Sequence, residues 1–195
     1  MLVIVSGCSG VGKNTIINEL LKRDENVVFL KTCTTRKKRY QEHGSEEKSP
    51  YIFISKEEFD KKIENEEFIE YEEIHKNFYG MLKKSVDEII TSDKVFIKDL
   101  GVLGQINLSR YLKGKAEVVS IFLQAPKKVL IERLKNRGES DIDLRLSRME
   151  FEMSYISNYD YVINNINLER TLKKIQSIIK KHQKKSEKVT SKNKK

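Results

Sequence analysis

A glycine-rich stretch directly after an apolar run constrains this chain most. Residues 2–6, LVIVS, form a short continuous apolar run, which predicts a buried strand. Residues 7–15, GCSGVGKNT, follow it, and from Lys13 onward apolar residues recur at helical spacing. The stretch matches the pattern G-x-x-x-x-G-K, which binds phosphate when it lies between a strand and a helix. The sequence therefore predicts a phosphate-binding loop in the structural context that it requires.

Each part of this loop has a physical role. Glycines let the backbone bend so that successive N–H groups point at phosphate oxygens, and the N-terminus of the following helix adds partial positive charge. The Lys13 ammonium reaches the terminal phosphates of such a ligand. An ordinary glycine-rich turn is the alternative, and the flanking strand and helix argue against it. We expect a nucleotide to bind the loop and the start of the helix, through Gly7, Ser9, Gly10, Val11, Gly12, Lys13, Asn14 and Thr15.

The loop departs from the usual pattern at Asn14, where a Ser or Thr hydroxyl normally binds Mg²⁺. The neighbouring Thr15 supplies a hydroxyl instead. Asp99 ends a second buried apolar run, KVFIKDL, and a carboxylate at that position suits a magnesium-linked role. A structural ion pair is the alternative for Asp99. We expect Mg²⁺ as the cofactor, with Thr15 and Asp99 as its candidate protein ligands.

Apolar runs alternate with helical patterns along most of the chain. Such alternation predicts an α/β fold with a parallel sheet covered on both faces. The alternation is interrupted at about 32–82. We expect this segment to be an inserted lobe, and 1–31 and 83–180 to form the core. The charged segment RGESDIDLR, at about 137–146, is expected to be a smaller mobile lid.

Charge and hydropathy exclude several classes of protein. The net charge is +9, but residues 181–195 hold seven lysines and one glutamate, so most of it belongs to a basic tail. We expect that tail to be disordered or a fraying helix end, and we do not expect a nucleic-acid partner. No apolar run approaches the ~18 residues of a membrane span, and the start lacks the basic region of a signal peptide. The expected location is therefore cytoplasmic, with no membrane partner. Cys8 and Cys33 are expected to be free thiols, and the positive loop favours a reactive thiolate at Cys8.

Several stretches taken together, in this order, resemble the guanylate kinase family: SGCSGVGKNT, TTRKKRYQEHG, YIFISKEEF, FIEYEEIHKNFYG, IFLQAP, ERLKNRG and YDYVIN. The resemblance runs from the first strand to about residue 175. It implies a five-stranded parallel phosphate-loop core with a monophosphate-binding lobe and a lid. It also implies transfer of phosphate from ATP, with Mg²⁺, to GMP or dGMP. Whether the protein is a monomer or a dimer stays open.

The resemblance also implies roles for side chains outside the loop. Arg36 and Arg39 clamp the acceptor phosphate, a task that suits guanidinium forks. Glu70 accepts from the N–H edge of guanine, and Asn165 lies beside the ATP base. The implied acceptor site comprises Thr32, Arg36, Arg39, Tyr51, Glu70, Tyr79 and Asp99. The implied catalytic cations are Lys13, Arg36, Arg133, Arg137 and Arg145. Taken alone, a helical arginine such as Arg133 is more simply a solvated side chain.

Two positions depart from the family pattern in the guanine site. Met81 stands where the family has a Ser or Thr after Tyr-Gly, and Gly101 stands where it has a second Asp. A buried polar edge left unpaired costs ~1–3 kcal/mol. A nucleoside monophosphate kinase with relaxed or altered base specificity is therefore an alternative. A non-catalytic binding module of the same fold is another, although Gly7, Gly12 and Lys13 remain in place.

Overall fold

The structure is a computed structural model that describes residues 1–38, 49–74, 76–136, 138 and 142–192 of the 195. Within these residues strands and helices alternate. The strands are β1 (Leu2–Gly7), β2 (Val27–Phe29), β3 (Thr32–Thr34), β4 (Tyr51–Phe53), β5 (Phe68–Ile74), β6 (Asn77–Leu82), β7 (Val95–Asp99), β8 (Val118–Gln124) and β9 (Tyr161–Asn164). The helices are α1 (Lys13–Arg23), α2 (Lys56–Glu64), α3 (Lys83–Thr91), α4 (Val102–Leu112), α5 (Lys127–Asn136), α6 (Ile142–Ser154) and α7 (Leu168–Lys192), with a short 3₁₀ turn, η2 (Ile156–Asn158).

The chain divides into two units. The large unit comprises Met1–Val28 and Val95–Lys195, and the small unit comprises Phe29–Lys94. The small unit includes the segment 32–82 that the sequence marks as an insertion. It also includes helix α3, which the sequence analysis assigned to the core. The small unit thus ends where the chain enters strand β7.

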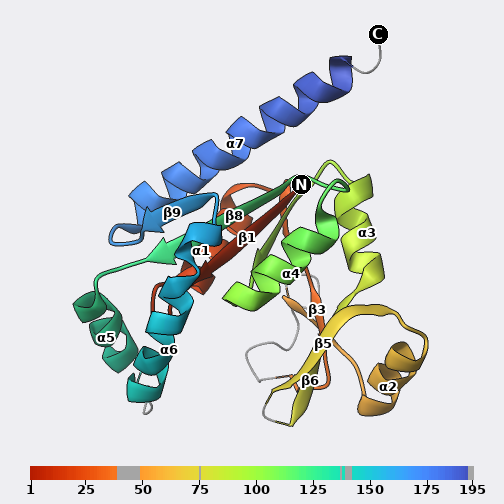
Figure 1. The fold of residues 1–195 in the computed structure, drawn as a ribbon, viewed down its shortest axis with the longest axis horizontal. Helices are drawn as coiled ribbons and strands as arrows, with labels where there is room; N and C mark the ends of the chain where they lie inside the picture. The colour runs from red at the N-terminus through yellow and green to blue at the C-terminus, as the bar shows by residue number, and fades with distance from the viewer. Residues whose placement is uncertain (39–48, 75, 137, 139–141, 193–195) are drawn as a thin grey trace. The chain divides into compact units, whose positions relative to one another are not determined.

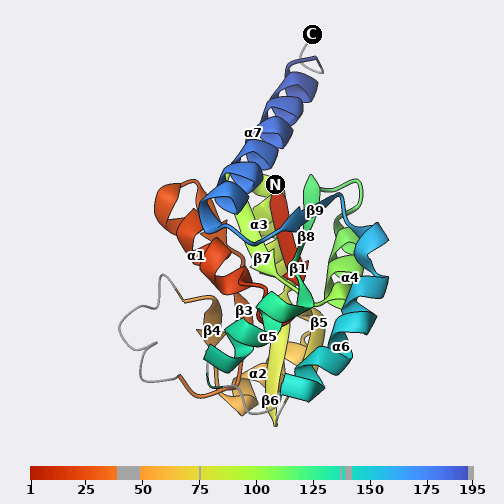
Figure 2. The ribbon, with the colours of Figure 1, turned by 90° about the vertical axis from the view of Figure 1, so that its left-hand side faces the viewer.

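The large unit is built on a five-stranded sheet in the order β2-β7-β1-β8-β9 (Figure 1). Strand β1 pairs in parallel with both β7 and β8, and β8 pairs in parallel with β9. Helices α1 and α7 cover one face of this sheet and α4 and α6 the other (Figure 2). Leu2, Val3, Ile4 and Val5 are completely buried, because a central parallel strand has no solvated face. The predicted fold class is therefore confirmed.

The small unit contains a four-stranded sheet in the order β4-β3-β6-β5, flanked by helix α2 (Figure 1). The rings of Phe59 and Phe68 stack in its core, with centroids 4.4 Å apart. Helix α2 begins after Ser55, whose Oγ accepts a hydrogen bond from the Glu58 backbone N–H at 3.1 Å. This bond satisfies one of the N–H groups that have no partner within the helix at its start. The sequence shows no clear strand pattern for β3 or β6. Strand β3 is very short, and β6 follows the strand-like run of β5 directly.

Helix α7 continues to Lys192, through most of the basic segment for which the sequence favoured disorder or a fraying end. Lysine and glutamine have good helix propensity, and adding residues to an existing helix avoids a new nucleation step. His182 anchors this part of α7, since its Nδ1 lies 2.6 Å from Glu117 Oε1 and its Nε2 lies 3.0 Å from the Tyr161 hydroxyl. None of the helices in the described ranges is long and apolar enough to cross a membrane.

Candidate nucleotide site

The phosphate loop connects β1 to α1 through glycines that no other residue can replace without strain. A Cβ on Gly7 would lie 2.1 Å from the Leu123 carbonyl oxygen of β8. Gly12 is the residue before α1 and has a φ of 97°, in the left-handed region. No side chain caps α1, so its first-turn N–H groups remain available to a ligand. The loop thus has the form of an anion site at a helix N-terminus.

Two cationic side chains reach this loop from different elements. The Lys13 ammonium donates to the Gly7 carbonyl oxygen at 2.6 Å and lies 3.5 Å from the Cys8 carbonyl oxygen. Arg145, on helix α6, donates from Nη1 to the Ser9 hydroxyl at 3.1 Å. The structure therefore brings a lysine and an arginine 132 positions apart in the chain to one loop.

Arg133 and Asn165 hold the loop by its backbone. Arg133 donates to the carbonyl oxygens of Val11, at 3.1 Å, and Asn165, at 3.0 Å. The Asn165 amide also donates to the Val11 carbonyl, at 2.8 Å, and is buried. Both side chains thus fix the loop conformation, a contribution that sequence motifs do not reveal. The catalytic role expected for Arg133 remains a prediction.

A cavity of about 660 Å³ opens beside the loop. Lys13, Asn14 and Thr15 line one part of it, whereas Ile166 and Leu168 line another part. Ile166 is 61% exposed and Leu168 37% exposed, so both present apolar surface at this cavity. The sequence analysis missed this apolar surface. The signal that could have found it is an isoleucine between two asparagines directly after a strand.

A smaller cavity of about 220 Å³ is also bordered by Lys13 and is lined in addition by Asp99, Gly101 and Glu152. A Cβ added to Gly101 would meet no atom within 4 Å, so the space beside it is open. Among the described residues no cluster of three or more His, Cys, Asp or Glu side chains forms a metal cage. Of the two predicted ligands, Thr15 lines the larger cavity and Asp99 the smaller one. A hydroxyl and a carboxylate are both groups that Mg²⁺ accepts together with substrate phosphates, so their role as ligands remains a prediction.

The structure contradicts the reactive thiolate expected at Cys8. Burial, together with the charge and hydrogen bonding of Glu152, raises the pKa of the Cys8 thiol to about 12. The Lys13 charge acts in the opposite direction but is a smaller cause. The thiol is therefore protonated at neutral pH, although it lies in a phosphate loop.

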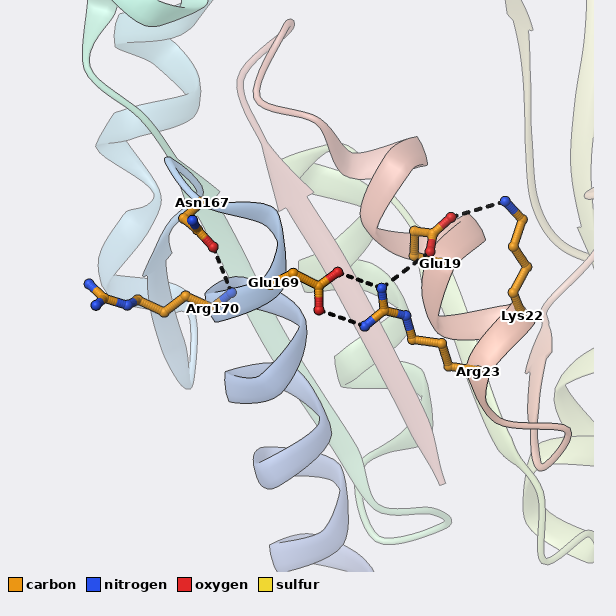
Figure 3. A network of polar contacts seen from close by, with 6 residues as sticks. All are labelled: Glu19, Lys22, Arg23, Asn167, Glu169 and Arg170. Atoms are coloured by element: carbon orange, nitrogen blue, oxygen red, sulfur yellow. Dashed lines mark hydrogen bonds and ion pairs between the residues drawn. The ribbon is translucent and has the colours of Figure 1, made fainter.

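The ends of α1 and α7 are joined by an ion-pair network (Figure 3). Arg23 donates to both carboxylate oxygens of Glu169, at 2.9 and 2.6 Å, and to Glu19 at 3.4 Å. Asn167 accepts from the Arg170 backbone N–H at 2.9 Å and so caps the start of α7. The network links the phosphate-loop helix to the segment that carries Asn165 and Ile166.

The small-unit sheet has two chemically different faces because side chains alternate along each strand. Cys33 and Phe68 point to the core beneath α2, together with Phe78 of β6. The neighbouring residues in register point to the opposite face, which we call the site face. Its strand residues are Thr32, Thr34, Tyr51, Phe53, Glu70, Glu72, Asn77, Tyr79 and Met81.

One part of the site face gathers an arginine and hydroxyl groups. The Arg36 guanidinium lies over the rings of Tyr51 and Phe53, 5.1 and 5.2 Å from their centroids. The Tyr51 and Tyr79 rings meet edge to face at 6.1 Å, and Thr32 is the register partner of Tyr51. The predicted residues Thr32, Arg36, Tyr51 and Tyr79 are thus brought together in the small unit.

Glu70 and Met81 lie opposite each other on the neighbouring strands β5 and β6. Met81 is 3% exposed, and it presents a thioether where the family has a hydroxyl. Arg39 and Arg137, both predicted to contact phosphate, lie outside the described residues.

The parallel sheet and the phosphate loop between β1 and α1 define the class of phosphate-loop α/β nucleotide-binding proteins. The model of the family described as guanylate kinase matches residues 1–182. The chain is 36% identical to a guanylate kinase from Thermotoga maritima over 183 residues, which are 92% of this chain and 86% of that protein. It is 39% identical to a guanylate kinase from Bacteroides thetaiotaomicron, over 92% of this chain and 88% of that one. A crystal structure of guanylate kinase from Anaplasma phagocytophilum matches with a TM-score of 0.68 at 30% identity, covering 94% of this chain and 86% of that chain. This chain therefore belongs to the guanylate kinase family.

Proposed function

We propose that this protein transfers the terminal phosphate of ATP to GMP, and to dGMP, giving ADP and the nucleoside diphosphate. The observation that carries the proposal is the convergence of Lys13, Arg145 and the open α1 N-terminus on one loop, in a chain of this family. The large unit binds the donor triphosphate, and the apolar surface of Ile166 and Leu168 receives its base. The small unit binds the acceptor.

The transfer needs placement and positive charge more than covalent chemistry. An oxygen of the acceptor phosphate attacks the γ-phosphorus, and the bond from that phosphorus to the β–γ bridging oxygen breaks. The negative charge on the transferring group is met by the Lys13 ammonium, Arg145 and the α1 amides. Lys13 already lies along the loop and needs only to turn from the Gly7 carbonyl to a phosphate oxygen.

The acceptor site is formed by side chains of the site face. Arg36, with the hydroxyls of Thr32, Tyr51 and Tyr79, supplies the hydrogen bonds that an acceptor phosphate requires. Glu70 supplies a carboxylate for the N–H edge of the base. Asp99 and Thr15 are the protein groups that would hold Mg²⁺, which neutralises phosphate charge when it is bound.

The proposal is tested by an acceptor panel. GMP, dGMP, IMP, AMP and UMP are offered side by side with Mg·ATP, and ADP formation is measured. We expect GMP to give the highest kcat/KM by a clear margin. Turnover that favours another base, or binding of Mg·ATP without transfer to any monophosphate, would overturn it.

A further inference from the structure

A second carboxylate, Glu72, lies on the site face two residues from Glu70. Tyr71, between them, points to the other face, because its ring lies 6.2 Å from that of Phe59 and 6.0 Å from that of Phe68. Glu70 is opposite Met81 in register, and Glu72 is opposite Tyr79. The Glu72 side chain is exposed. It is thus available to a ligand bound on this face.

The site face is electrostatically divided. The arginine and the tyrosine hydroxyls gather around β4 and β6, where Arg36 contacts Tyr51 and Tyr51 contacts Tyr79. Among the described strand residues of this face, the carboxylates are Glu70 and Glu72, both on the edge strand β5. A nucleoside monophosphate placed on this face therefore directs its phosphate toward Arg36 and an N–H-bearing base edge toward β5.

Guanine presents more donors than one carboxylate can accept in plane. Its Watson–Crick edge carries one N1–H and two N2–H hydrogens, and a bidentate carboxylate takes N1–H and one N2–H. The second N2–H is then left without an acceptor, at a cost that a specific site avoids. Neither Met81 nor Gly101 contributes a carboxylate to accept it.

Glu72 is displaced from Glu70 in the direction that this third hydrogen requires. Successive positions on one face of a strand are about 6.6–7 Å apart. Because Glu72 lies opposite Tyr79, the displacement is toward the phosphate end of the face. Along the edge of guanine, the order from O6 is N1, then N2, then the side that bears the sugar. The second N2–H therefore follows the two donors assigned to Glu70, in the same direction.

We propose that Glu72 accepts the second N2–H of guanine and is a specificity-determining residue of the acceptor site. This inference rests on the proposed function. It assigns the recognition of the 2-amino group to two carboxylates on one strand, in a chain that carries glycine at position 101.

The test compares GMP with IMP, which is the same nucleotide without the 2-amino group. Glu72→Ala is expected to lower kcat/KM for GMP about tenfold or more and to change kcat/KM for IMP less than about twofold. Glu70→Ala is expected to lower both, because the N1–H is common to the two nucleotides. The matched control is Glu73→Ala, since Glu73 is also exposed on the same strand but lies opposite Phe78 and points to the core face. This control should leave both values unchanged, and thermal unfolding of each variant should match the wild type.

Three results would overturn the inference. An equal loss for GMP and IMP in Glu72→Ala would show that the carboxylate does not read the 2-amino group, and so would no loss for either. A changed GMP-to-dGMP ratio with an unchanged GMP-to-IMP ratio would place the carboxylate on the ribose 2′-hydroxyl instead. Failure of the proposed function is a separate result, since wild-type protein would then not prefer GMP at all.

Discussion

The two regions proposed to bind nucleotides differ in the chemical groups that they provide. In the large unit, the groups proposed to bind phosphate are backbone N–H groups of the loop between β1 and α1, and Lys13, Arg133 and Asn165 all donate to main-chain carbonyls of that loop. In the small unit, the proposed binding groups are side chains at alternate positions of four strands. The first region depends on chain conformation, and the second depends on residue identity.

This difference explains where the chain tolerates departures from its family. Asn14 replaces the usual hydroxyl in the loop, yet the glycines and the uncapped helix N-terminus that we propose to contact phosphate are present. Met81, by contrast, stands where the family resemblance predicts a hydroxyl, at a position where the side chain itself is expected to contact the base. Substitutions should therefore affect turnover in the large unit and substrate choice in the small unit.

The largest effect is expected from replacing Lys13, the lysine of the phosphate loop. Lys13→Ala should lower kcat/KM about 10³-fold, because the lysine stabilises charge on the transferring phosphate. The fold should persist, since the lysine is at the helix start and its main contacts are to the loop carbonyls. Steady-state kinetics and thermal unfolding measure the two effects. Lys22→Ala on the same helix is the matched control, because its side chain is 70% exposed and pairs only with Glu19 among the described residues. A comparable loss in that control would assign the effect to general helix charge.

A smaller effect, confined to one substrate, is expected at Arg36. Arg36→Ala should raise KM for GMP about 10- to 100-fold, which is the value of a hydrogen bond to a charged group. The affinity for Mg·ATP, measured by titration calorimetry, should stay the same. Arg36→Lys should recover part of the loss, because it restores the charge but not the bidentate fork. A variant that lost ATP affinity as strongly as GMP affinity would break the division of roles between the two regions.

Replacing Met81 is expected to increase the preference for guanine, whereas the two preceding substitutions lower activity. Met81→Ser should raise the ratio of kcat/KM for GMP to that for AMP about fivefold, because the hydroxyl can donate to guanine O6. The buried thioether is lost at the same time, so stability should fall by about 2 kcal/mol. Denaturant unfolding measures that cost. An unchanged ratio in a folded variant would show that Met81 does not contact the base edge.

The sequence predicted the phosphate loop of the large unit more completely than the site face of the small unit. Glycine spacing after an apolar run reports both conformation and chemistry, so the loop was predictable. The alternation of apolar runs with helical patterns predicted a parallel sheet, and the resemblance to the guanylate kinase family implied its five strands. The roles of Arg133 and Asn165 in fixing the Val11 carbonyl were not, because contacts across 122 and 154 positions leave no local pattern. Glu72 was missed for a related reason. Which of the successive carboxylates in FIEYEEI faces a ligand depends on the β5–β6 register, and that register is a tertiary property.

The smallest expected effect concerns the reactivity of the two cysteine thiols, one in each unit. Burial raises the pKa of Cys8 to about 12 and that of Cys33 to about 11, from an ordinary value of 9.0. Both thiols should therefore react slowly with an aromatic disulfide reagent at pH 8 in the native protein and rapidly after unfolding. Rapid native labelling of Cys8 would show that the loop charge outweighs its burial.

The same shifts set the sign of a stability effect at high pH. The folded state keeps both thiols protonated above pH 9, whereas the unfolded chain releases those protons. Their contribution to stability is therefore complete below pH 9 and is lost as pH rises toward about 11 for Cys33 and about 12 for Cys8. Melting temperatures measured across this range should fall less steeply in Cys8→Ala and Cys33→Ala than in the wild type. Equal slopes would mean that the thiols titrate alike in the folded and unfolded chains, and neither burial would then affect their ionisation.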